Sequence, residues 1–413
     1  MTDCLSVYLH DCRVGKLTCD HRTQAFEFRY DDEYLRSAGA CELSQSLPLS
    51  DQPFDALRSK VFFENLLPPE VVRRRLEKII HVSHDNVFGY LKALGGECAG
   101  AVSLYEEGVI PETSSKRLMP LSTAEADELM KILPRRPLLA DKIDGYRISG
   151  AGAQDKLLVR LDGSHISLPL YGAASTHIVK PPMTRFAETV ANECFCQKLA
   201  DRVGLSAAES GFLDLPSATC YWTKRFDRIQ DRDDVRRLHQ EDFCQMMGCP
   251  SEQKYESEGG PSLVRCLRFL RTSRLGASGM LKFLDYTLFN FLIGNADAHG
   301  KNYAILYQGP MIVVAPLYDL MCTSAYPDLG DRPAMTIGGA TAFSEVRREH
   351  FMRLAENADI SPRLVFDRLE SLVERIVADA PALAEELSDT GHPSAVYTSI
   401  ENVIRESIDR LAR

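Results

Sequence analysis

The sequence predicts an α+β protein with a small N-terminal module and a larger domain in which strands come first and helices follow. The chain has 413 residues, more than a single hydrophobic core of ordinary size can support, so two or three domains are expected. Short alternating apolar runs occur near the N-terminus and again between about 146 and 226, whereas later residues show helical spacing. We expect the N-terminal module at 1–110, a linker with a short helix at 111–140, and the larger domain at 141–413.

Alternation of apolar residues predicts strands in the first 30 residues. Apolar side chains occupy every second position at 5–9 and again at 26–30, and Gly15 marks a turn between these runs. The module is completed by helices expected at 68–80 and 86–94 and by a strand at 99–105. Within the linker, Ser122-x-x-Glu125 resembles a capping box for a short helix that ends near Pro134.

The larger domain is expected to open with a β-hairpin. A strand at 146–149 leads into a glycine-rich segment, and a strand at 157–161 follows it. The further elements expected are strands at 165–170, 176–180 and 220–226, a helix at 185–203 and an almost wholly apolar helix at 281–293. No internal repeat is visible.

Composition disfavours several classes of function. The net charge is −10 and no basic run stands out beyond short pieces such as Arg73–Arg75, so direct nucleic-acid binding is not expected. Apolar runs stay below membrane-spanning length, and the first residues lack the pattern of a secretory signal. The twelve cysteines form no C-x-x-C pair, and His81-x-x-His84 has no third ligand nearby, so a metal site is not expected. We expect the cysteines to be reduced, mostly buried thiols. The protein is expected to be cytoplasmic and to make no contact with a membrane.

A glycine-rich segment, Gly150-Ala151-Gly152-Ala153-Gln154-Asp155-Lys156, could bring backbone amides close to a phosphate group. It is not a Walker loop, because Lys156 is followed by Leu157 rather than by Ser or Thr. A glycine-rich turn between two strands is how protein kinases cover nucleotide phosphates. A purely structural turn is the alternative.

A lysine closes the predicted strand at 176–180. Lys180 could reach from the end of an apolar strand into a cleft and neutralise phosphate oxygens. Glu193 is a candidate partner on the following helix, since it shares a helical face with Phe186 and Val190. The alternative is that Glu193 lies in solvent at the edge of this apolar stripe.

The most specific signal follows the predicted apolar helix. Asp297 and Asn302 are separated by the interval that kinase catalytic loops place between the catalytic aspartate and a magnesium-binding asparagine. Asp319, after two β-like runs, could hold the magnesium ion that bridges nucleotide phosphates. A polar loop that merely ends the helix is the alternative. Together these residues predict phosphoryl transfer, with Asp297 positioning the acceptor hydroxyl.

Nearly the whole chain carries a series of collinear motifs: Phe62-Phe63-Glu64-Asn65-Leu66-Leu67-Pro68, Gly152–Lys156, His177–Pro181, Arg225-Phe226-Asp227-Arg228, His239–Asp242, Lys254-Tyr255-Glu256 with Gly259-Gly260-Pro261, Asn295–Asn302 and Leu317-Tyr318-Asp319. Together these motifs resemble the HipA family of toxin kinases. The resemblance implies a bilobal, protein-kinase-like fold with strands up to about 226 and a mainly helical lobe after them.

The resemblance also implies roles for individual residues with ATP and Mg²⁺ as cofactors. Asp297 would be catalytic, and Asn302 and Asp319 would bind the metal. Ser149, directly before the glycine-rich loop, would be autophosphorylated, which would expel the loop and stop ATP binding. The nucleotide would contact Gly150, Ala151, Gly152, Ala153, Gln154, Lys156 and Lys180, the backbone of Lys224 and Phe226 as a hinge, and, near ribose or phosphates, Gln240 and His299.

Members of this family pair with a HipB-like helix-turn-helix antitoxin, so operator DNA would be reached only through that partner. The substrate would be a serine or threonine of a protein, with an aminoacyl-tRNA synthetase such as glutamyl-tRNA synthetase as the known type of target. Asp319 is followed by Leu320 and Met321 rather than by Phe-Gly, so a DFG-style switch is not expected. Two other functions stay open: a small-molecule phosphotransferase, and a catalytically silent scaffold of a repressor complex.

Overall fold

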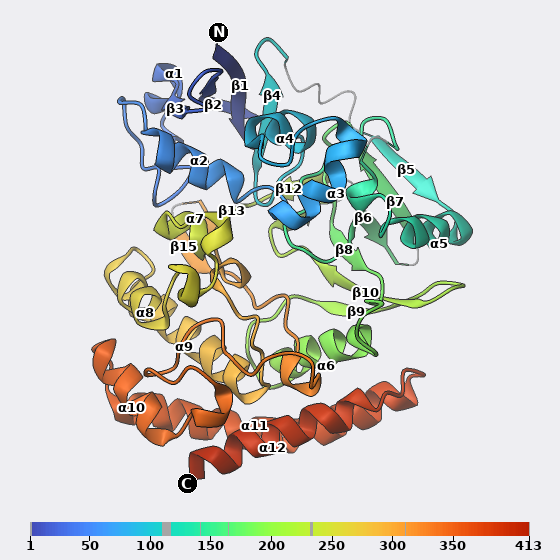
Figure 1. Ribbon diagram of the computed structural model, residues 1–413, viewed down its shortest axis with the longest axis vertical. Coiled ribbons are helices and arrows are strands. Elements are labelled where there is room, and N and C mark those ends of the chain that lie inside the picture. The colour runs from blue at the N-terminus through green and yellow to red at the C-terminus, as the bar shows by residue number, and fades with distance from the viewer. Residues whose placement is uncertain are drawn as a thin grey trace.

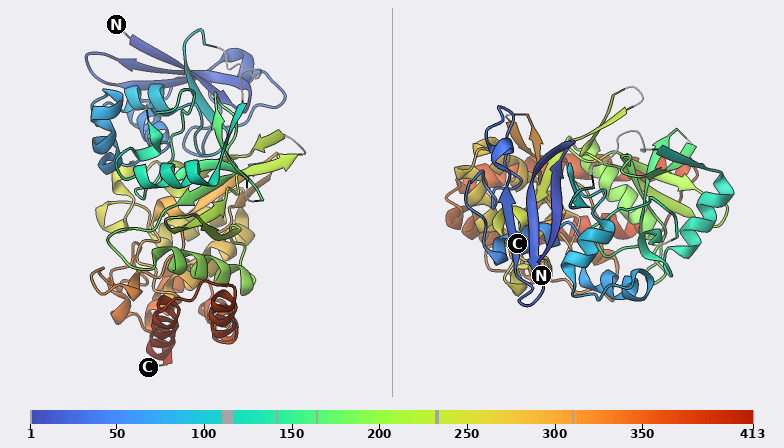
Figure 2. Two further views of the ribbon diagram at one scale, coloured as in Figure 1. Left: turned by 90° about the vertical axis from the view of Figure 1, so that its right-hand side faces the viewer. Right: turned by 90° about the horizontal axis from the view of Figure 1, so that it is seen from above.

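The computed structural model describes residues 2–109, 117–140, 142–163, 165–231, 234–309 and 311–412. The N-terminal module and a strand-rich lobe lie beside each other in the upper part of Figure 1, a helical lobe lies below them, and the C-terminal helices lie at the end opposite the N-terminus. Figure 2 shows the same arrangement from the side and from above. This arrangement confirms the expected α+β, bilobal architecture with an N-terminal module.

The N-terminal module is a four-stranded antiparallel sheet covered by helices. Its strand order is β3-β2-β1-β4, and Phe26, Phe28 and Tyr30 of β3 all point into the core, as their alternation predicts. The elements are β1 (Thr2–Leu9), β2 (Cys12–Asp20), β3 (Phe26–Tyr30), α1 (Asp32–Leu35), α2 (Ala56–Glu64), α3 (Glu70–Ile80), α4 (Val87–Leu94) and β4 (Val102–Glu106).

Part of the expected linker belongs to the next sheet. Residues 111–116 lie outside the described residues, but β5 (Arg117–Leu121) pairs with β7 (His165–Leu170) at the edge of a six-stranded sheet. Helix α5 (Thr123–Ile132) begins at the expected capping box of Ser122 and Glu125, and its apolar residues join the core of this sheet. This part of the chain therefore contributes to the strand-rich lobe.

The six-stranded sheet has the order β5-β7-β6-β8-β10-β9. The expected hairpin at 146–161 is wrong: Ile148 makes an isolated parallel bridge with Glu97 of the N-terminal module instead. Both neighbours of β6 are already taken by β7 and β8, so the segment before the glycine-rich loop finds no free edge there. The remaining elements of this lobe are β6 (Leu157–Asp162), β8 (His177–Lys180), α6 (Thr189–Arg202), β9 (Ser210–Asp214) and β10 (Thr219–Lys224).

The helical lobe is built around α9 (Gly276–Leu292), whose second half is buried on all sides. Gly294, just beyond the end of this helix, has a left-handed φ of 65°, and a Cβ added there would meet Ser324 and Val403. The catalytic-loop candidate, Asn295–Asn302, follows directly.

The part of the chain after β10 also contains β11 (Arg228–Asp231), β12 (Asp234–Arg237), β13 (His239–Asp242), α7 (Phe243–Met247), α8 (Leu263–Thr272), β14 (Ala304–Gln308), β15 (Met311–Val314), α10 (Arg348–Asn357), α11 (Pro362–Asp389) and α12 (Val396–Ala412).

Among the described residues, no helix combines the length and apolar character needed to cross a membrane. The twelve cysteines are free, and most of them are buried.

Candidate functional site

A cavity of about 640 Å³ lies between the six-stranded sheet and the helical lobe. Its lining brings together almost all the residues singled out from the sequence: Gly150, Ala151, Gly152, Ala153, Gln154, Lys156, Lys180, Lys224, Phe226, Gln240, Asp297, His299, Asn302 and Asp319. Ser149 is the exception, since it is buried beside the cavity rather than in its wall.

Lys180 lines this cavity and contacts residues of both lobes. It ends β8, and its ammonium group lies 2.5 Å from Oε1 of Glu193 on α6 and 2.6 Å from Oδ1 of Asp319. Burial alone would raise the pKa of Asp319, but the ammonium groups of Lys180 and Lys156 hold that pKa below its ordinary value. Glu193 therefore lies inside the protein, paired with the lysine, rather than at a solvent-exposed stripe edge.

The glycine-rich loop carries a second buried ammonium group. Lys156 donates to the carbonyl oxygen of Ala151 across the loop. Burial, reinforced by the nearby charge of Lys180, lowers the pKa of Lys156 to about 8. Two buried ammonium groups at one wall make the cavity attractive to an anion, and a bound anion would raise the pKa of Lys156 again.

The loop after α9 is held in shape by its own polar groups. The amide of Asn302 donates to the backbone oxygen of Asp297 at 2.8 Å, and the backbone N–H of Asp297 donates to Oδ1 of Asn295 at 3.1 Å. Thr323 accepts a hydrogen bond from the backbone of Ala296 at 2.7 Å. These bonds turn Asp297 and Asn302 toward the same cavity as Asp319.

The carboxylate of Asp297 contacts His299, which the sequence assigned to the site, and Tyr255, which it did not. Tyr255 donates its phenolic hydrogen to Oδ1 of Asp297, and Nε2 of His299 lies 3.8 Å from the same oxygen. The side chain of Asp297 is half-exposed to the cavity, yet desolvation by the surrounding protein raises its pKa, while the hydrogen bond from Tyr255 and the charge of Lys254 oppose that rise. Burial and Lys254 lower the pKa of His299 to about 3, so this imidazole is neutral at pH 7.

The segment expected as a hinge begins at Lys224, the last residue of β10. The backbone N–H of Lys224 donates to the oxygen of Glu209 at 2.8 Å, so that N–H already has a protein partner. The ring of Phe226 packs against Tyr318, with ring centroids 5.0 Å apart. Gln240 of β13 reaches the same region, and its buried Oε1 has no hydrogen-bond partner among the described residues.

Ser149 is completely buried at the junction with the N-terminal module. Its backbone N–H donates to the oxygen of Glu97 at 3.0 Å, and its hydroxyl oxygen has no hydrogen-bond partner within the described chain. A phosphate group attached there would need space and solvent that this position lacks.

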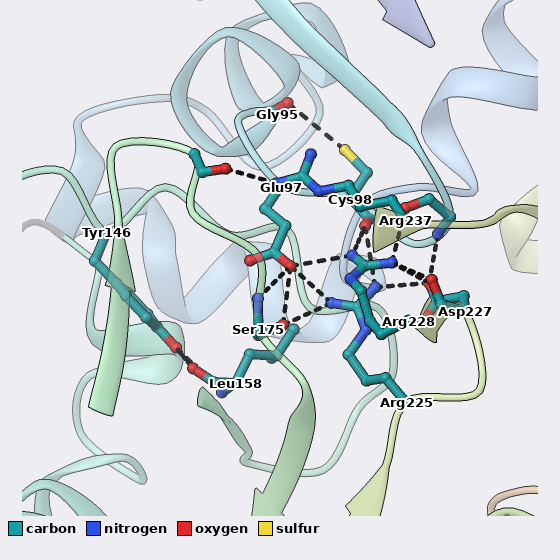
Figure 3. Close-up of polar contacts among 12 residues, drawn as sticks. Gly95, Glu97, Cys98, Tyr146, Leu158, Ser175, Arg225, Asp227, Arg228 and Arg237 are labelled. Carbon is teal, nitrogen blue, oxygen red and sulfur yellow. Dashed lines mark hydrogen bonds and ion pairs between the residues drawn. The ribbon is translucent and has the colours of Figure 1, made fainter. Parts of the chain in front are cut away.

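A buried ionic cluster lies behind this junction (Figure 3). Oε1 of Glu97 lies 3.2 Å from Arg225 and 3.0 Å from Arg228, and it also accepts hydrogen bonds from the backbone and hydroxyl of Ser175, both at 2.9 Å. Asp227 lies 2.8 Å from each arginine. The cluster holds the N-terminal module against the segment that follows β10.

The N-terminal module also reaches the catalytic-loop candidate. Lys301 donates to Oδ1 of Asn65 at 2.7 Å, to the backbone oxygen of Asn65 at 3.0 Å and to Asp242 at 2.6 Å. Tyr255 and Asn65 both stand in motifs that the sequence contains, but spacing alone gave neither of them a role. Their contacts join positions 42 and 236 residues apart, which no local pattern indicates.

Comparison with known proteins places both parts of the chain in described families. Residues 5–105 match the HipA N-terminal domain family and residues 148–382 match the HipA-like C-terminal domain family. A putative kinase of Sinorhizobium fredii, Y4mE, is 41% identical over 398 residues, which cover 94% of this chain and 92% of that protein. The serine/threonine-protein kinase toxin HipA of Shewanella oneidensis is 28% identical over 387 residues, covering 90% of this chain and 87% of the toxin.

A solved structure resembles the whole fold. The complex of HipA, HipB and operator DNA from Shewanella oneidensis MR-1 contains a chain that superposes with a TM-score of 0.83 at 26% identity, covering 98% of this chain and 96% of that one. The two family matches, the kinase relatives and this structural likeness lead to one conclusion: the chain belongs to the HipA family of kinases.

Proposed function

We propose that this kinase transfers the γ-phosphoryl group of ATP to a serine or threonine hydroxyl of a protein. The observation that carries the proposal is the meeting of Asp297, Asn302, Asp319 and Lys180 around one cavity. Phosphoryl transfer depends more on charge neutralisation and a positioned acceptor hydroxyl than on a covalent intermediate. Lys180 and a metal ion held by Asn302 and Asp319 would neutralise charge, and Asp297 would position the hydroxyl.

The cavity fits a nucleotide with its metal ion. Its wall offers the ammonium groups of Lys156 and Lys180 for phosphates, while Oε1 of Gln240 and Nδ1 of His299 are buried polar atoms without partners among the described residues. Asn302 and Asp319 present the oxygen ligands that Mg²⁺ prefers. When bound, the ion would neutralise charge on the phosphates.

Each residue then has a separate task. Lys180, held by Glu193, would bind phosphate oxygens, and releasing Asp319 from Lys180 would free its carboxylate for the metal. Asp297 would accept a hydrogen bond from the acceptor hydroxyl and orient it toward the phosphorus atom. The loop carrying Lys156 would cover the phosphates.

The test uses γ-labelled ATP, Mg²⁺ and proteins of a bacterial lysate. We expect the parent chain to label proteins and an Asp297→Asn variant to lose at least about 100-fold in rate while still binding ATP. Label found in metabolites alone would indicate a small-molecule phosphotransferase. Equal growth inhibition by the parent and by Asp297→Asn would indicate a silent scaffold.

We further propose Ser149 as the autophosphorylation site that switches the enzyme off. Its position directly before the glycine-rich loop supports this proposal. Its complete burial gives the switch a physical cause, because a dianionic phosphate could not remain there and the loop would have to leave. Mass spectrometry after incubation with ATP should find phosphate on Ser149 of the parent and none in Asp297→Asn. Phosphate confined to other residues would contradict it.

We also propose a small DNA-binding antitoxin of the HipB type as a partner. The support is the solved Shewanella complex, in which HipA assembles with HipB and operator DNA. The net charge of −10 favours DNA contact through the partner rather than by this chain alone.

The type of target that we propose is an aminoacyl-tRNA synthetase, for example glutamyl-tRNA synthetase. Phosphoproteomics of cells expressing the parent or Asp297→Asn would identify the target.

A further inference from the structure

Tyr255 holds one of the two carboxylate oxygens of Asp297. Its phenol donates to Oδ1, the oxygen that also faces Nε2 of His299 at 3.8 Å. Among the described residues, Oδ2 of Asp297 has no hydrogen-bond partner. The side chain of Asp297 is 51% exposed, so the oxygen that is not held can be reached from the cavity.

The backbone that carries this phenol is closely constrained. The carbonyl oxygen of Tyr255 accepts hydrogen bonds from the backbone N–H groups of Glu258 and Gly260, both at 3.0 Å. A Cβ at position 260 would collide with the carbonyl oxygens of Gln253 and Tyr255, so only glycine fits this tight turn. Tyr255 therefore stands on a rigid turn rather than on an open loop.

The turn is anchored on both sides. Toward the catalytic loop, the carbonyl oxygen of Lys254 accepts a hydrogen bond from the backbone of Gly300 at 3.2 Å. On the other side, the carboxylate of Glu256 accepts hydrogen bonds from the backbone N–H of Thr336 at 2.5 Å and from its hydroxyl at 3.1 Å. The distance between Tyr255 and Asp297 is therefore fixed by the surrounding chain.

The ring itself is packed between two neighbours. His299 meets it edge to face, with centroids 5.1 Å apart and planes at 88°, and the ammonium group of Lys254 lies 5.0 Å from the ring centroid. Both contacts use the ring and leave the hydroxyl free to donate. Removing the hydroxyl alone would therefore preserve the packing.

We propose that Tyr255 is a positioning residue for phosphoryl transfer: it fixes the carboxylate of Asp297 through Oδ1, so that Oδ2 faces the acceptor hydroxyl. The inference rests on the proposed role of Asp297. The terminal torsion of an aspartate is broad, so a carboxylate without this bond samples orientations in which neither oxygen meets the acceptor. Misplacing a reacting group by about 1 Å can reduce rate about 100-fold.

The test is Tyr255→Phe, which keeps the ring and removes only the donor. Labelling of lysate proteins from γ-labelled ATP is measured as the rate at saturating ATP and as the ATP concentration that gives half this rate. We expect the rate to fall about 10- to 100-fold, with the half-saturating ATP concentration and the melting temperature unchanged. A merely structural role would lower the melting temperature or change both kinetic parameters.

Tyr397→Phe is the control, because the hydroxyl of Tyr397 also donates a hydrogen bond, in this case to the backbone oxygen of His392 at 2.9 Å, but it lies in the C-terminal helix α12 and outside the cavity lining. This variant should keep the parent rate. A parent-like rate in Tyr255→Phe, or phosphate found on Tyr255 itself, would overturn the positioning role. Full activity in Asp297→Asn would instead overturn the proposed function, so the two failures are distinguishable.

Discussion

Asn65 of the N-terminal module accepts two hydrogen bonds from Lys301, one on its side-chain oxygen at 2.7 Å and one on its backbone oxygen at 3.0 Å. Lys301 directly precedes the proposed metal ligand Asn302, and its own carbonyl oxygen accepts a hydrogen bond from Tyr318 at 2.6 Å. The N-terminal module is thus in direct contact with the loop that carries the proposed chemistry.

The contact predicts that Asn65→Ala lowers turnover although residue 65 lies in another domain. Without the side-chain oxygen, Lys301 keeps Asp242 and the backbone oxygen but loses one bond that fixes its position. We expect the labelling rate at saturating ATP to fall about 10-fold. Asn65→Ala combined with Lys301→Met should be no slower than Lys301→Met alone, because both act on one contact. Additive losses would show that Asn65 acts elsewhere.

Lys180 offers a second prediction, on nucleotide binding. Lys180→Met removes a buried ammonium group from the phosphate wall, and it leaves Glu193 and Asp319 without their shared partner. We expect the labelling rate at low ATP to fall about 100-fold or more. Lys198→Met on the same helix as Glu193, but outside the cavity lining, is the control and should retain the parent rate. An unchanged rate in Lys180→Met would remove Lys180 from the proposed site.

Local sequence patterns predicted much of this arrangement. The interval from Asp297 to Asn302 and the lysine at the end of β8 depend on short-range spacing, and each of these residues does line the cavity. The expected capping box of Ser122 and Glu125 is also confirmed. In each case the side chain's position is set by the element that carries it.

Other features depended on which distant segments pair. The strand expected at 146–149 contains the right apolar residues, but its partner turned out to be Glu97 of the other domain rather than β6. Tyr255 and Asn65 likewise reach the site through contacts between separate elements. A single sequence specifies periodicity, and it does not indicate which edges remain free once the sheet is complete.

The cluster around Glu97 predicts a large effect on stability. Glu97→Gln leaves the two arginines Arg225 and Arg228 with one carboxylate between them, in a place where Glu97 is 1% exposed. Breaking a buried ion pair costs about 3–5 kcal/mol in the free energy of unfolding. Denaturant titration should show this loss, whereas Glu370→Gln, which breaks a surface pair with Arg348 at 3.0 Å, should change little. Equal effects would mean that burial of the cluster contributes nothing.

A final prediction concerns pH and the contact between Glu241 of β13 and the N-terminal module. Its carboxylate is fully buried and accepts hydrogen bonds from Ser44, from the backbone of Gln45 at 2.9 Å and from Tyr307 at 2.6 Å. Burial raises the pKa of Glu241 to about 7, although these donors oppose the rise.

The raised pKa determines the sign of the effect. Between pH 7 and about pH 4.5 the folded protein binds a proton at Glu241 that the unfolded chain does not, so this residue's contribution to the free energy of unfolding grows as pH falls. That contribution is lost as pH rises through 7, and its full size is on the order of 3 kcal/mol, since each pKa unit corresponds to about 1.4 kcal/mol. Glu241→Gln cannot titrate. Denaturant titrations across this range should therefore show the parent gaining stability over Glu241→Gln as the pH is lowered, and a difference that stays constant with pH would contradict the shift.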